Sequence, residues 1–82
     1  MREIDLELEE LVINENSPIA GMELKESRLR EKYGVMLLAI KRGDENIVNP
    51  EPTEKFLPGD VLILSGPSDK LTTLEKVVAG VF

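Results

Sequence analysis

The chain contains no cysteine, no histidine and no tryptophan in its 82 residues, and only 4% of it is aromatic. Without cysteine it has neither disulfides nor thiolate chemistry. Without histidine it has no His-ligated metal and no Ser-His or Cys-His catalytic pair. Long hydrophobic runs are also missing: stretches such as Val35 to Ile40 are far shorter than a membrane span. We therefore expect neither these active sites nor a transmembrane helix.

Positive charge is scarce as well, with 10 basic against 16 acidic residues and a net charge of −6. Binding to a phosphate backbone requires a basic face, so we predict no nucleic-acid partner. What remains is 41% hydrophobic and 32% charged, which is typical of a globular chain. We expect residues 1–82 to form a single domain whose small core would benefit from association.

The most informative stretch is Phe56 to Gly66, FLPGDVLILSG. Leu57-Pro58-Gly59-Asp60 predicts a tight turn, in which Asp60 bonds through its own side chain. The apolar run Val61 to Leu64 then predicts a strand. Because successive residues are apolar, both faces of this strand should be covered, one by a helix and the other by a further layer or a second chain.

The N-terminal third predicts a strand and a helix. Residues 4–13 alternate apolar and acidic side chains, which indicates a strand, and a bulge at Glu9-Glu10 would keep both halves facing the core. A helix using Ile4, Leu8 and Leu11 is the alternative. Residues 22–33 have strong helix propensity but only a loose apolar face, so the helix is short or bent and ends at Gly34.

The remaining chain predicts a strand over Val35 to Ile40, a turn at Gly43-Asp44 and a return strand that begins at Ile47-Val48. After the Phe56 to Gly66 element, Ser68 is the predicted N-cap of a second helix that ends at Gly80. Its apolar stripe consists of Leu71, Leu74, Val77 and Val78. The predicted order is strand, helix, strand, strand, strand, helix.

Arg42 follows a predicted buried strand and precedes a glycine turn, so its guanidinium could hold a phosphate through two parallel hydrogen bonds. Alternatively it is a solvated turn residue or pairs with Asp44 or Glu45. Asn46 could read the edge of a base or form an Asx turn.

The carboxylates Asp44, Glu45, Glu51 and Glu54 gather around a proline-rich connection. Oxygen ligands can hold Ca²⁺ or Mg²⁺, but EF-hand spacing is missing and loop carboxylates are usually solvated, so we predict no metal site. Nothing in the sequence places two carboxylates in a shielded pocket, so we expect no enzyme activity.

Several short motifs occur in order along nearly the whole chain. They are Ser17-Pro18-Ile19-Ala20-Gly21 with Leu24, Tyr33-Gly34-Val35 leading through Ala39-Ile40 to Arg42-Gly43, Pro50 with Thr53, and Leu57-Pro58-Gly59-Asp60-Val61-Leu62 with Ser65-Gly66. This ordered set resembles the TrkA-C domain, the C-terminal subdomain of the RCK potassium-conductance regulators.

The resemblance implies an α+β domain, β-α-β-β-β-α, with a mostly antiparallel sheet packed with two helices. It also implies a cytoplasmic homodimer that regulates a potassium channel or another cation transporter by sensing a ligand. A ligand-free dimerisation or docking module is the alternative. In most such proteins a Rossmann subdomain precedes this domain; since no GxGxxG occurs here, we expect an excised domain or the tail of another arrangement.

Some family members bind cyclic di-AMP between two copies of the domain, which makes cyclic di-AMP or another nucleotide the candidate ligand. Of the family motif, this chain has Arg42, Asn46, Ile47 and Val48. The motif's Asp two residues before the Arg is Ile40 here, and the interval from Arg to Asn is shorter than in the motif.

Overall fold

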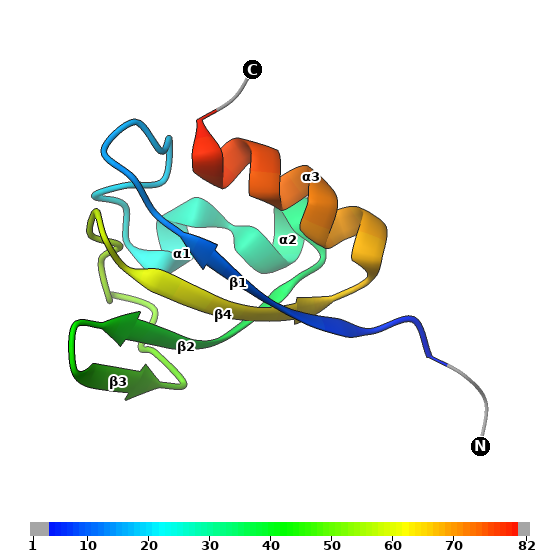
Figure 1. Ribbon diagram of the computed structural model, residues 1–82, viewed down its shortest axis with the longest axis horizontal. Coiled ribbons are helices and arrows are strands. Elements are labelled where there is room, and N and C mark those ends of the chain that lie inside the picture. The colour runs from blue at the N-terminus through cyan, green and yellow to red at the C-terminus, as the bar shows by residue number, and fades with distance from the viewer. Residues whose placement is uncertain (1–3, 81–82) are drawn as a thin grey trace.

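The four strands of the domain form one antiparallel sheet in the order β1-β4-β2-β3. The computed structural model describes residues 4–80. Its elements are β1 (Glu7–Val12), α1 (Leu24–Ser27), α2 (Leu29–Tyr33), β2 (Met36–Arg42), β3 (Glu45–Val48), β4 (Val61–Gly66) and α3 (Ser68–Ala79). The helices all lie on one side of the sheet (Figure 1). The predicted α+β class and strand order along the chain are confirmed.

The strand β4 lies between β1 and β2 and supplies the centre of the core. Its side chains alternate, with Leu62 and Leu64 buried under the helices and Val61 and Ile63 half-buried on the opposite face. Gly66 permits a close approach, because a Cβ there would lie 3.0 Å from Cγ1 of Val35. The buried apolar residues are Leu11, Ile13, Ile19, Leu29, Val35, Ile40, Phe56, Leu62, Leu64, Leu71, Leu74 and Val78.

The first strand is confirmed, but its predicted bulge is wrong. The β1–β4 register is continuous from Glu7 to Val12, and the irregularity lies in β2, between Leu37 and Ala39. Without a bulge, only every second residue of β1 can face the core. Leu11 and the following Ile13 take those positions, whereas Leu8 is 72% exposed on the other face.

The predicted helix over residues 22–33 is divided into α1 and α2 by Arg28. This residue has φ 52° and ψ 41°, the left-handed conformation that ends one helix and precedes the next. A left-handed L-residue costs roughly 1–2 kcal/mol. Gly34 then terminates α2, with its N–H donating to the carbonyl of Arg30.

The helix α3 begins at Ser68, with Pro67 as its N-cap, so the prediction of Ser68 as the cap is shifted by one residue. Its predicted apolar stripe packs on the sheet, and Gly80 ends it in a left-handed conformation. None of the helices within residues 4–80 has the length and apolar character needed to cross a bilayer.

Candidate functional site

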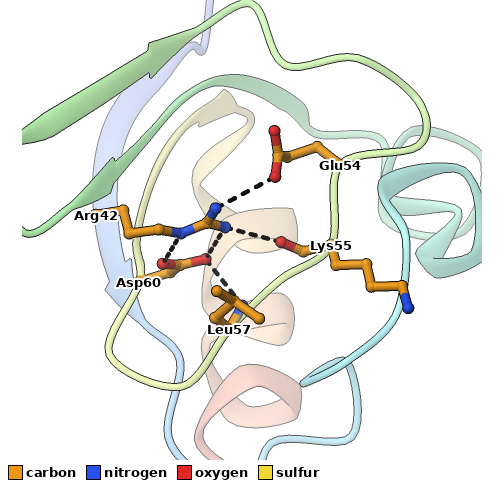
Figure 2. A network of polar contacts seen from close by, with 5 residues as sticks. All are labelled: Arg42, Glu54, Lys55, Leu57 and Asp60. Carbon is orange, nitrogen blue, oxygen red and sulfur yellow. Dashed lines mark hydrogen bonds and ion pairs between the residues drawn. The ribbon is translucent and has the colours of Figure 1, made fainter.

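The strongest polar cluster of the domain joins Arg42 to Asp60. The guanidinium forms a two-pronged bond with the carboxylate, Nε to Oδ1 at 2.9 Å and Nη2 to Oδ2 at 2.8 Å. Nη1 also donates to Oε2 of Glu54 at 3.2 Å, and Nη2 to the carbonyl of Lys55 at 2.8 Å (Figure 2). These four bonds occupy four of the five N–H groups of the guanidinium.

The Asp60 carboxylate is buried, with its side chain 1% exposed. Burial by itself raises its pKa. The hydrogen bonds from Arg42 and from the N–H of Leu57, together with the charge of Arg42, outweigh this and hold the pKa below its usual value. The same contact raises the pKa of Arg42, so both groups stay charged at neutral pH. The Leu57 bond, at 2.9 Å, confirms that Asp60 closes its own turn.

The cluster fixes a segment, residues 52–56, that pairs with the start of α1. The N–H groups of Leu24 and Lys25 donate to the carbonyls of Glu54 at 2.8 Å and Pro52 at 2.9 Å. These are first-turn amides, which a helix cannot satisfy internally. Because Arg42 binds the Glu54 side chain and the Lys55 carbonyl, it connects β2 to the segment that positions α1.

A groove of about 730 Å³ opens beside this segment, between α1, α2 and the ends of β2 and β3. Its apolar lining includes Leu24, Leu29, Val35, Met36, Val48 and Pro52. Lys25, Arg30, Glu31 and Asn49 supply the polar lining. An apolar floor with a few polar groups and a volume of roughly 300–1,000 Å³ is typical of a small-ligand site. Because the Lys25 ammonium pairs with Glu23 at 3.5 Å, Arg30 is the cation of the lining that favours an anionic ligand.

The structure does not bring the four predicted ligand residues onto one face. In the β2–β3 pair, Arg42 and Ile47 lie on the helix-covered side, and Asn46 and Val48 lie on the open side. Val48 lines the groove and is 74% exposed. Val48 pairs with Ala39 of β2. Arg42 comes three residues after Ala39, so it lies roughly 10 Å along β2 from this pair.

Two residues of the groove, Lys25 and Arg30, were not predicted as ligand residues from the sequence. The available signal was the concentration of basic residues in 25–32, where four of the chain's ten lie. Of the acidic residues weighed as metal ligands, Glu54 pairs with Arg42 instead. Within residues 4–80, no three acidic side chains lie close enough together to hold a metal ion.

Several potassium transport proteins contain a region that is similar to this chain. It is 38% identical over 76 residues to a probable potassium channel protein of Methanocaldococcus jannaschii, covering 93% of this chain and 22% of that protein. It is 43% identical over 63 residues to the Ktr system potassium uptake protein C of Bacillus subtilis, covering 77% and 28%. The chain thus spans about a quarter of these relatives.

Among solved structures, the RCK C domain of the potassium transport protein KtrA, in complex with cyclic di-AMP, has a TM-score of 0.80. It shares 35% identity, and the match covers 88% of this chain and 82% of that one. The GsuK channel bound to NAD has a TM-score of 0.76 with 26% identity, covering 92% and 14%. The family model of the TrkA-C domain matches residues 8–79. The chain therefore belongs to the TrkA-C domain family.

Proposed function

We propose that residues 1–82 form a ligand-sensing regulatory domain of a potassium, or other cation, channel or transporter. The domain acts as a homodimer in the cytoplasm, attached to its membrane transport protein, and has neither a catalytic nor a nucleic-acid-binding role. The ligand is a small anion or nucleotide, with cyclic di-AMP and NAD as the candidates because similar solved structures contain them.

The observation that carries this proposal is the groove. The protein has a net charge of −6, yet Lys25 and Arg30 stand at an apolar cleft of about 730 Å³. The flat face of a base suits the floor formed by Leu24 and Leu29, and a phosphate suits the guanidinium of Arg30. The groove's position between helices and strand ends allows a bound ligand to alter how the exposed Met36 and Val48 meet a second copy.

The four residues predicted from sequence remain part of the proposed site, in different roles. Val48 contacts the ligand in the groove, and Asn46 extends the same face of β3. Ile47 anchors the hairpin through its packing on the core. Arg42 lies outside the groove and contributes indirectly, because its bonds to Glu54 and to the Lys55 carbonyl fix the segment that positions α1.

Calorimetric titration with cyclic di-AMP, NAD, AMP and inorganic phosphate tests the proposal. We expect saturable binding of at least one nucleotide and a loss of about tenfold or more in affinity for Arg30→Ala, because a charge-assisted bond contributes roughly 1.5–3 kcal/mol. Lys76→Ala on α3 is the matched control, since Lys76 lies outside the groove, and should bind as the unaltered chain does. Arg42→Ala is less informative, because it also removes support from the 52–56 segment.

An absence of binding across the panel would favour the second candidate, a dimerisation or docking module without a ligand. The open face of the sheet favours that function independently, since it exposes Leu8, Val12, Met36 and Val48. In a ligand-sensing domain, by contrast, the ligand can shift the dimer only by its differential affinity for two geometries.

A further inference from the structure

A second hollow, of about 480 Å³, lies at the end of the sheet where β1 and β2 begin and β4 ends (Figure 1). Leu6, Val35 and Met36 form its apolar walls, and Ser65 provides a hydroxyl. Among the described residues that line it, Arg30 alone is charged. The second hollow is therefore a mostly apolar cavity with one cation and one hydroxyl, which is the composition expected of a small-ligand subsite.

The second hollow adjoins the groove beside α1. Arg30 and Met36 line both cavities, so the two meet at the start of β2. Ser65 of the second hollow pairs with Met36. Val48 of the groove pairs with Ala39, which lies three residues further along β2, and it lies on the opposite side of that strand from Ser65. Ser65 and Val48 are therefore roughly 12–15 Å apart, which is too far for one nucleoside to fill both cavities.

Arg30 stands where the two cavities meet, and its charge is available to a ligand. Within residues 4–80 no carboxylate lies within ion-pair distance of its guanidinium, whereas Lys25 pairs with Glu23. A guanidinium can bind a phosphate through two parallel hydrogen bonds. A phosphate held by Arg30 would have an apolar cavity on each side of it.

We propose that the second hollow is a subsite for the second nucleoside of a dinucleotide held within a single copy of the chain. One base lies on the apolar floor of the groove, the phosphate lies at Arg30, and the other base lies between Leu6 and Met36. The Ser65 hydroxyl then offers a hydrogen bond to the second nucleoside. This inference rests on the proposed function and narrows its ligand class to compounds in which phosphate joins two nucleosides.

A dinucleotide gains affinity from both cavities. Its second base covers apolar surface on Leu6 and Met36, which are 60% and 52% exposed. Because the two nucleosides are joined, the second one binds without a further loss of translational freedom. We therefore expect a dinucleotide to bind at least about tenfold more tightly than AMP.

Calorimetric titration of the domain with AMP, NAD and the linear dinucleotide ApA tests this inference. Ser65→Leu fills the second hollow and should bring the affinity for both dinucleotides to within about threefold of that for AMP. It should leave the affinity for AMP unchanged within about twofold. Ser65→Ala keeps the hollow open and should retain most of the advantage of the dinucleotides. Thr72→Leu is the matched control on α3, outside both cavities, and should bind as the unaltered chain does.

Equal affinities for AMP and the dinucleotides, or an advantage that Ser65→Leu leaves intact, would overturn the inference while the groove remained a site for one nucleotide. If no nucleotide binds, the inference falls together with ligand sensing. Should Ser65→Leu fail to fold, the amide resonances of the unaltered domain decide the matter. ApA, but not AMP, should shift the resonances of Leu6 and Ser65, and no shift there at saturating ApA would overturn the inference.

Discussion

Removing the guanidinium of Arg42 should be among the most damaging single changes to the stability of this domain. Arg42→Ala leaves the Asp60 carboxylate buried, at 1% exposure, with only the N–H of Leu57 as a partner. Breaking a buried ion pair by deleting one partner costs about 3–5 kcal/mol. Because the Arg42 side chain is itself 26% exposed, we take the lower end, about 3 kcal/mol. A domain of this size has a free energy of unfolding of roughly 4–12 kcal/mol, so the loss is a large fraction of it.

The assay is urea or thermal unfolding followed by far-UV circular dichroism, since the chain has no tryptophan to report by fluorescence. We expect the melting temperature to fall by roughly 12–24 °C. Lys55→Ala is the control, because Lys55 is exposed and joins the cluster only through its backbone carbonyl. It should change the free energy of unfolding by less than about 0.5 kcal/mol.

The pH dependence identifies the cause. The lowered pKa of Asp60 contributes stability that is fully present above the unfolded value of about 3.9 and is lost as the pH falls through the folded pKa. In Arg42→Ala the buried carboxylate has no cation, so its pKa rises and protonation relieves the penalty. The stability difference between the two proteins should therefore begin to shrink above about pH 4, as Asp60 of the variant is protonated, and should shrink further as the pH falls through the folded pKa of the unaltered protein. An equal difference at pH 7 and in acid would refute the electrostatic reasoning.

Three further changes test the backbone and the core, all by the same unfolding assay. Arg28→Gly should stabilise the domain by about 0.5–1 kcal/mol, because glycine adopts the left-handed conformation at φ 52° without strain; a destabilised variant would contradict this. Gly80→Ala should destabilise it by about 1–2 kcal/mol, since the new Cβ would lie 2.8 Å from the Asn16 carbonyl oxygen at φ 73°, and an unchanged melting temperature would count against that contact. Leu74→Ala should cost about 2–5 kcal/mol, because this side chain is fully buried, and a loss below about 1 kcal/mol would show that α3 does not pack as described.

Much of the local structure follows from the sequence. The turn before β4, the two-residue turn at Gly43-Asp44 and the ends of α2 and α3 were all predicted, because each depends on residues adjacent in the chain. Gly34 and Gly80 end helices in the left-handed conformation for the same local reason.

The face of β1 could not be predicted from its own residues. Alternation distinguishes Leu6 and Leu8 from Leu11 and Ile13 but does not say which set meets the helices. The choice depends on register with β4, where Leu11 pairs with the buried Leu62. Register is a long-range property, and the acidic residues between the apolar ones made a bulge equally consistent with the pattern.

The candidate site likewise depends on contacts between residues that are distant in the chain, which the sequence did not predict. Arg42 was predicted to hold a phosphate, to be solvated or to pair with Asp44 or Glu45, but it pairs with Asp60, which lies 18 residues away at the start of the neighbouring strand β4. Only the neighbours Asp44 and Glu45 were considered as pairs. The groove escaped prediction because its lining comes from five separate stretches of the chain, and no local motif marks a cavity that several elements enclose.

Titration of the ¹⁵N-labelled domain with cyclic di-AMP, followed through its amide resonances, determines whether a nucleotide binds in the groove beside α1. We expect saturable shifts concentrated on groove residues such as Lys25, Arg30, Val48 and Asn49, with little change along the exposed side of α3. Shifts confined to other surfaces, or none at saturating nucleotide, would contradict it.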